Sequence, residues 1–199
     1  MAYDEIVARC AQEDPSIFAF DTAKAEELIE LSPWIETAEV RRKLPDTVVI
    51  RVTERSPVAF MPAGETLWLI DAEGRVLGED DGTWTGLVAI TGPETAVVPG
   101  QFLDKSSYGW GLRVLGALGP IARGKLTEIS VQAGDVSLIL DDGCVVLLGK
   151  DSGDTGVKVA VLESVLQDLA SEGKMAERID LRYEKVAIKL RAIEQGTPH

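Results

Sequence analysis

The chain of 199 residues holds a single histidine, His199, at its last position. Nucleophile systems of the Ser/His/Asp or Cys/His kind need an imidazole fixed within hydrogen-bond reach of the nucleophile, and a terminal residue is poorly placed for that. The two cysteines, Cys10 and Cys144, lie far apart and in no C-x-x-C spacing, so zinc sites built from His and Cys are not expected either. Each cysteine is interpreted as a small apolar residue.

Two further patterns bind ligands in other proteins. Four aspartates flank one predicted hairpin: Asp141, Asp142, Asp151 and Asp154. They lack the residue order of a calcium loop and its closing Glu, so they are interpreted as turn residues. The glycine-rich run 109–116 has no strand before it and no Gly-Lys-Ser/Thr after it, so no nucleotide site is expected. We therefore predict no catalytic residue, no metal and no cofactor.

The formal net charge is −13, from 33 acidic and 20 basic residues. The field of such a chain repels nucleic-acid phosphates and anionic lipid surfaces, so neither partner is expected. The longest wholly apolar stretch, 114–122, is well short of the roughly 20 residues that cross a bilayer. The acidic start does not resemble a signal peptide.

The first 57 residues are predicted to form a small module of two helices and a hairpin. Helical spacing predicts one helix over 3–12 and a second after Asp21, whose side chain is expected to cap it. From Ile35 onward, the spacing of apolar residues changes to every second position, and the run 47–53 is rich in β-branched residues. Together these features predict a β-hairpin.

Residues 58–199 are predicted to form an antiparallel β domain with two helices. Short apolar runs are separated by turn pairs such as Asp142-Gly143, which hairpins prefer. The helices are expected over 105–118 and 157–169, where apolar residues recur at helical spacing. The predicted fold class is therefore α+β, with one domain at 1–57 and a second at 58–199.

The last two predicted strands, 177–183 and 186–191, form a hairpin at the end of the chain. A terminal strand often lies at a sheet edge, where unpaired N–H and C=O groups can bind a partner strand. Ile188 and Leu190 alternate there with basic residues, which discourage self-pairing and attract an acidic partner. On pattern alone, an ordinary protected edge fits equally well.

Four segments in order resemble one family. Residues 33–59 closely resemble the POTRA module of the FtsQ/DivIB family of bacterial cell-division proteins. The run 69–76 looks like the opening hairpin of the family's β domain. The runs 140–150 and 179–183, with the amphipathic helix between them, are similar to its late segments.

The resemblance implies a scaffold of the division machinery, and not an enzyme, that lies in the inner membrane at the division site with its POTRA and β domains outside the cytoplasm. It implies binding to FtsB and FtsL, contacts with the septal wall synthases FtsW and FtsI, and a link between early and late division proteins. A partner strand is then expected at the C-terminal edge, beside Arg182, Tyr183, Val186, Ile188 and Leu190. A recruitment surface is expected on the POTRA hairpin, at Val40, Arg42, Val49 and Arg51.

The sequence also departs from the family pattern. No segment resembles the family's cytoplasmic tail, membrane helix or first POTRA strand, so we expect a shortened chain or a start codon placed late. Lys189 and Leu190 stand where some members place a late aromatic residue. Two alternatives remain at this point: another POTRA-containing secretion or assembly factor that binds polypeptides, and a periplasmic enzyme with a pocket of converging carboxylates.

Overall fold

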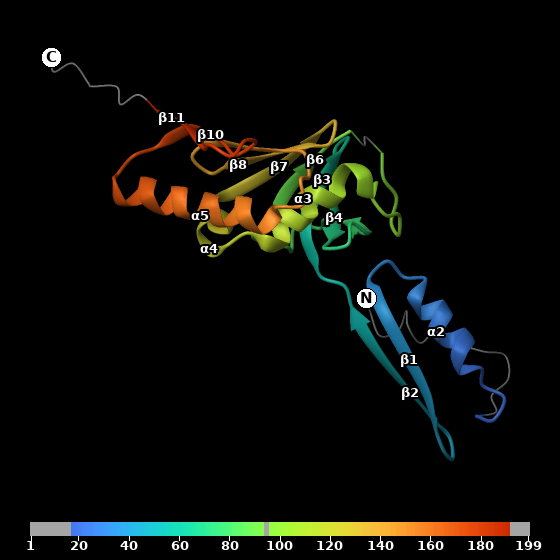
Figure 1. Ribbon diagram of the computed structural model, residues 1–199. Coiled ribbons are helices and arrows are strands. Elements are labelled where there is room, and N and C mark those ends of the chain that lie inside the picture. The colour runs from blue at the N-terminus through green and yellow to red at the C-terminus, as the bar shows by residue number, and fades with distance from the viewer. Residues whose placement is uncertain (1–16, 94–95, 192–199) are drawn as a thin grey trace.

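The computed structural model describes residues 17–93 and 96–191, and these form two modules (Figure 1). The first module has a helix and a two-stranded sheet, and the second has a nine-stranded sheet with helices on one face. The predicted α+β class is confirmed. The helix predicted over 3–12 lies outside the described residues. In the described ranges, no helix is long and apolar enough to cross a membrane.

The first module packs one helix against one hairpin. Helix α2 (Thr22–Glu30) lies against β1 (Ile35–Lys43), which pairs with β2 (Thr47–Glu54). Asp21 caps the helix as predicted, because its carboxylate accepts the Lys24 backbone N–H at 3.0 Å. Four buried residues form the core: Ala25, Ile29, Ile35 and Val40.

A β-bulge sets which residues of β1 face this core. Ile35 and Val40 are an odd number of positions apart, yet both are buried. The register shifts between Ile35 and Thr37, and the extra residue turns the later part of the strand over. The side chains of β1 that follow Val40 are exposed.

The second module is built on one large sheet, with the strand order β11-β10-β9-β8-β7-β6-β3-β4-β5. The strand bounds are β3 (Pro57–Ala63), β4 (Thr66–Asp71), β5 (Val76–Glu79), β6 (Val88–Thr91), β7 (Leu126–Gln132), β8 (Asp135–Leu140), β9 (Val145–Gly149), β10 (Ala176–Asp180) and β11 (Ala187–Leu190). The expected antiparallel pairing holds for most neighbours, but β3–β6, β6–β7 and β9–β10 are parallel. Parallel neighbours require crossover connections, and the helices supply two of them.

Three helices of the described chain cover one face of this sheet: α3 (Lys105–Ala117), α4 (Pro120–Lys125) and α5 (Thr155–Ser171) (Figure 1). The sequence predicted α3 and α5 but not the short α4. At Gly111 of α3 there is little room for a side chain, because a Cβ there would lie 3.2 Å from Ile129 and 3.3 Å from Val131. The glycine therefore lets the helix approach the sheet closely.

The two edges of the sheet differ. On the outer side of β5, the segment Gly100–Leu103, here called the strap, runs alongside. The Gly100 N–H donates to Val76 O, the Val76 N–H donates to Gln101 O, and the Leu103 N–H donates to Gly74 O, each at 2.8 Å. On the outer side of β11, no strand pairs in the part of the chain that the structure describes.

Candidate partner-binding site

The backbone of β11 alternates between a paired and an open side. The Arg191 N–H donates to Met175 O at 2.8 Å, so Arg191 faces inward, toward β10. Successive residues of an antiparallel strand present their N–H and C=O groups to opposite sides. Lys189 therefore also faces β10, whereas Ile188 and Leu190 present their backbone groups to the open side of the sheet.

The side chains of these two residues lie on the helix-covered face. Ile188 pairs with Ile179, and Leu190 pairs with Ala176, and both partners are buried. A bulge in β10 between Ala176 and Arg178 keeps Ala176 and Ile179 on the same face. Ile188 and Leu190 remain 41% and 45% exposed, so the core ends in an uncovered apolar margin.

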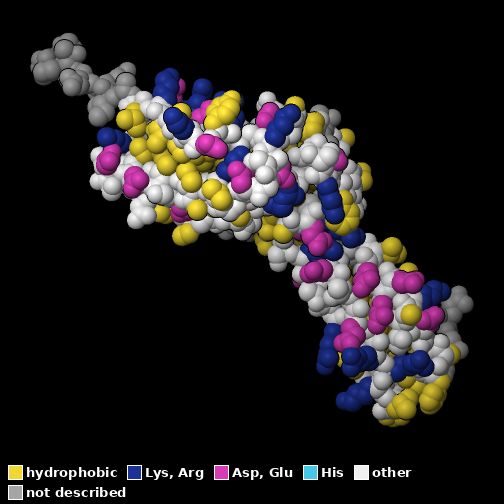
Figure 2. Space-filling model, in the orientation of Figure 1, with side chains coloured by type: hydrophobic (Ala, Val, Ile, Leu, Met, Phe, Trp, Pro, Cys, Tyr) yellow, Lys and Arg dark blue, Asp and Glu magenta, His cyan; other side chains and the backbone are white. Residues whose placement is uncertain are grey.

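Helix α5 extends this margin. Val161, Val165 and Leu169 recur every four residues and are half-buried against the core. We call these three residues, with Ile188 and Leu190, the apolar ledge. Figure 2 shows hydrophobic side chains gathering on the visible face between α5 and the β10–β11 hairpin. A contiguous exposed apolar surface of this kind is a common mark of a protein interaction site.

The ledge has a hollow at each end. One hollow, with a volume of about 430 Å³, lies between the start of α5 and the turn after β10, and Val161 and Val186 both line it. The other, of about 410 Å³, lies at the end of α5, where Leu169, Met175 and the buried Cys144 line it. Burial raises the pKa of the Cys144 thiol to about 11, with a smaller contribution from the charge of Asp142.

In the turn after β10, Tyr183 lies next to Arg182, whose side chain is held in place by Asp180. The Arg182 guanidinium donates to both oxygens of Asp180, with Nε at 2.9 Å and Nη2 at 2.6 Å. These hydrogen bonds hold the pKa of Asp180 below its ordinary value and raise that of Arg182. The Arg182 guanidinium lies 5.5 Å from the Tyr183 ring centroid, and Tyr183 is 72% exposed. The turn is therefore pre-formed, with its aromatic ring free for contact.

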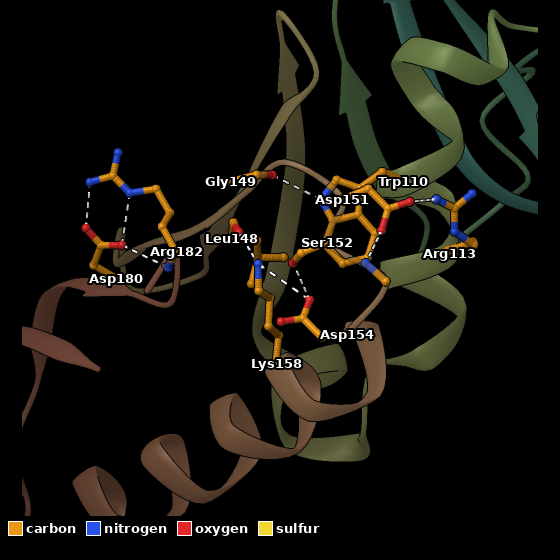
Figure 3. A network of polar contacts seen from close by, with 11 residues as sticks. Trp110, Arg113, Leu148, Gly149, Asp151, Ser152, Asp154, Lys158, Asp180 and Arg182 are labelled. Atoms are coloured by element: carbon orange, nitrogen blue, oxygen red, sulfur yellow. Dashed lines mark hydrogen bonds and ion pairs between the residues drawn. The ribbon is translucent and has the colours of Figure 1, made fainter. Parts of the chain in front are cut away.

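A polar network lies beside this turn, at the end of β9 (Figure 3). The nearly buried Lys158 of α5 donates to Leu148 O at 2.8 Å, and the Trp110 indole of α3 donates to Gly149 O at 3.0 Å. Gly149 has a φ of +73°, and a Cβ there would lie 3.0 Å from Cγ of Arg182. The end of β9 is thus tied to two helices, and the Arg182 side chain rests directly on its backbone.

The aspartates near this network serve the fold. Asp151 pairs with Arg113, and Ser152 donates to Asp154. This hydrogen bond holds the pKa of Asp154 below its ordinary value, and the nearby Lys158 charge lowers it further. In the described ranges, no group of three or more His, Cys, Asp or Glu residues could hold a metal ion.

Family models match most of the chain. The model for "POTRA domain, FtsQ-type" matches residues 2–55, and that for "Cell division protein FtsQ/DivIB, C-terminal" matches residues 59–182. The chain belongs to the FtsQ/DivIB family. The C-terminal match ends before β11, so the open edge of this FtsQ/DivIB chain lies beyond the matched segment.

Curated relatives agree with the family models. The chain is 30% identical to the cell division protein FtsQ of Myxococcus fulvus over 88% of its own length and 64% of that protein. It is 33% identical to FtsQ of Anaeromyxobacter sp. over 89% of its own length and 63% of that protein. It therefore spans less than two thirds of either relative. Among solved structures, the major extracytoplasmic domain of DivIB from Geobacillus stearothermophilus is similar with a TM-score of 0.40 and 13% identity, over 60% of this chain and 97% of that one.

Of the four residues expected at a recruitment surface of the FtsQ-type module, three line one hollow and the fourth is buried. Val40 is 4% exposed and belongs to the core, so its inclusion was wrong, because the bulge turns it inward. Arg42 pairs with Val48 on the helix side and donates to Phe18 O at 2.9 Å. Val49 and Arg51 lie on the outer face and, together with Arg42, line a hollow of about 210 Å³.

The last strand lies at a sheet edge, where the sequence pattern predicted it, but partner binding there stays a prediction, and the residues that support the turn beside it were missed. Among the expected residues of the FtsQ/DivIB edge, Arg182 and Tyr183 form the turn, Val186 lines a hollow, and two lie in β11. The supporting roles of Lys158 and Trp110 were not foreseen. One signal was present, because a lysine within an apolar helix stripe needs a buried partner.

Proposed function

We propose that this chain is a scaffold of the bacterial division machinery that binds FtsB and FtsL, with a strand of FtsB adding to β11. The observation that supports this most directly is the outward backbone of Ile188 and Leu190 beside the apolar ledge. Main-chain hydrogen bonds would supply affinity, and alternate side chains of the partner would enter the ledge and its hollows. Family membership supports a role in division.

The charges near β11 favour an acidic partner segment. Arg178, Lys189 and Arg191 gather here in a chain whose net charge is −13. The Lys189 ammonium is partly satisfied by Glu177 at 2.8 Å, and the Arg191 guanidinium donates to Asp142 O at 2.6 Å. A partner strand with alternating apolar residues and flanking carboxylates therefore matches both the ledge and the charges.

The outer face of the FtsQ-type hairpin is proposed as a second surface, for recruitment of the chain to the division site. Arg41 and Lys43 are exposed there with Arg51, which makes the hairpin basic against an acidic chain. Contacts with the wall synthases FtsW and FtsI belong to the same proposal. So does placement outside the cytoplasm, with membrane attachment through a helix that precedes this segment in the family.

Amide hydrogen exchange tests the strand addition directly. The amides of Ile188 and Leu190 point away from β10, so they should exchange rapidly in the free chain and become protected when an extracytoplasmic segment of FtsB is added. The inward amide of Lys189 is the internal control, because its hydrogen bond to β10 should protect it in both states. Binding that protects other amides and leaves Ile188 and Leu190 unprotected would contradict strand addition.

A further inference from the structure

The link between the two modules is only two residues long. Strand β2 ends at Glu54 and β3 begins at Pro57. The Arg55 N–H donates to Trp34 O at 2.8 Å, which ties the link back to the start of the hairpin. A link this short and this well bonded restricts how far the first module can swing on the second.

Arg55 also bonds across the link. Its Nη1 atom donates to Asp71 Oδ2 at 2.7 Å and to Glu73 Oε2 at 2.9 Å, both in the second module. On the first module, its Nε atom donates to Ile35 O at 3.4 Å. The side chains of Arg55 and Asp71 are only 10% and 5% exposed, so water competes little for this pair.

Asp71 is itself held in place. Its Oδ1 atom accepts the backbone N–H groups of Glu73 at 2.9 Å and Arg75 at 2.8 Å, within the turn from β4 to β5. The guanidinium therefore meets a carboxylate whose position the turn has already fixed. Removing either partner would leave the other charge buried with only its remaining hydrogen bonds.

Aromatic packing joins the modules at a second place. The Trp34 ring of the first module stacks on Trp84 of the second, with centroids 6.2 Å apart and planes at 18°. Trp34 also lies over the backbone of β5, where a Cβ on Gly78 would be 3.4 Å from its indole nitrogen. Pro33 approaches Gly100 of the strap, at 3.6 Å from a Cβ built there.

We infer that these contacts form an interdomain clamp, which consists of Arg55 with Asp71 and Glu73, and Trp34 with Trp84, and which makes the two modules one rigid body. The polar and aromatic parts act at separate points, so together they oppose both bending and twisting. The clamp holds the outer face of the β1–β2 hairpin and the open edge of β11 at a fixed separation and orientation. A partner at one surface is then presented in a set geometry to a partner at the other.

Distance measurements between spin labels test the clamp without any partner, so their outcome does not depend on the proposed strand addition. Thr47→Cys on the hairpin and Gln167→Cys on α5 provide two exposed sites, in a chain that also carries Cys10→Ser and Cys144→Ala. With the clamp intact, double electron–electron resonance should give one narrow distance distribution. Arg55→Met should broaden it, whereas Arg51→Met, at an exposed arginine of the first module that takes no part in the clamp, should leave it narrow.

A second variant covers the case in which Arg55→Met fails to fold. Trp84→Ala removes half of the aromatic contact from a loop and should also broaden the distribution. In thermal unfolding, the unmodified chain should show one transition. In either variant the first module should melt separately, with a midpoint below that of the single transition in the unmodified chain. A distribution that is already broad in the unmodified chain, or that stays narrow in both variants, overturns the inference.

Discussion

The two edges of the large sheet differ in how their outward backbone N–H and C=O groups are paired. At β5 the chain covers its own edge, because the strap accepts from and donates to the outer backbone groups of residues 74 and 76. At β11 the outward groups of Ile188 and Leu190 have no pairing strand within the described chain. Natural proteins rarely leave such an edge without blunting it. The contrast supports the proposal that β11 receives a partner strand, and the following predictions test it.

The largest effect is expected from loosening the closed edge. Leu103→Ala truncates a buried strap residue and should cost about 3 kcal/mol of unfolding free energy, which chemical denaturation measures. The exposed β5 edge should then promote self-association in sedimentation experiments. Val98→Ala, at an exposed position before the strap, is the matched control and should change neither property. Unchanged stability of Leu103→Ala would mean that the strap does not hold this edge.

At the open edge, a proline in place of Ile188 should weaken partner binding without disrupting the fold. Ile188→Pro removes an N–H that points away from β10, so the fold should tolerate it. Binding of the FtsB segment should weaken about 30-fold, or roughly 2 kcal/mol, in calorimetry. Lys189→Pro is the control, because it removes an inward N–H and should disrupt the β10–β11 hairpin itself. Full affinity in Ile188→Pro would place the partner elsewhere.

Two exposed aromatic residues sharpen the comparison further. Tyr183 projects from the turn beside the open edge, whereas Phe102 lies in the strap at the closed edge. Tyr183→Ala should weaken partner binding about tenfold because it removes a large exposed aromatic residue next to the proposed partner strand. Phe102→Ala should leave the affinity unchanged. Equal losses in the two variants would argue that the partner does not distinguish the edges.

The smallest expected effect is a dependence on pH. Glu177 accepts a hydrogen bond from Lys189, which holds its pKa below the ordinary value of 4.5. Because the folded pKa is lowered, the ion pair contributes fully above the ordinary value, and its contribution is lost as the pH falls through the folded pKa. Exchange of the Lys189 amide, corrected for intrinsic rate, should therefore rise in acid relative to that of Val76. Glu177→Gln should abolish this difference.

Much of the local structure follows from short-range chemistry in the sequence. Asp21 caps α2, and Gly143 adopts a φ of +81° in the turn where an Asp-Gly pair was noted. The Asp142 carboxylate accepts the Cys144 N–H at 2.9 Å in the same turn. Such features depend on residues a few positions apart, so the pattern alone predicts them.

Features that depend on distant residues were not predictable. The strap shows no regular spacing of apolar residues, and its hydrogen bonds to the edge of the sheet depend on where β5 lies in the fold. The bulges in β1 and β10 reverse which residues face inward, so the alternation of residues along the strand could not predict the burial of Val40. The short α4 contains Pro120 and Gly124, which hide it from a propensity argument. The outward direction of Ile188 required the register of the hairpin.

The buried Cys144 thiol can serve as a probe of local opening in the large sheet. With a pKa of about 11, only about one thiol in ten thousand is a thiolate at neutral pH, and the side chain is almost inaccessible. Although Cys144 lines the hollow at the end of α5, it is only 1% exposed, so an alkylating reagent should reach it mainly when the segments around that hollow open. The rate at which Cys144 is alkylated therefore measures how often the structure next to the apolar ledge opens locally.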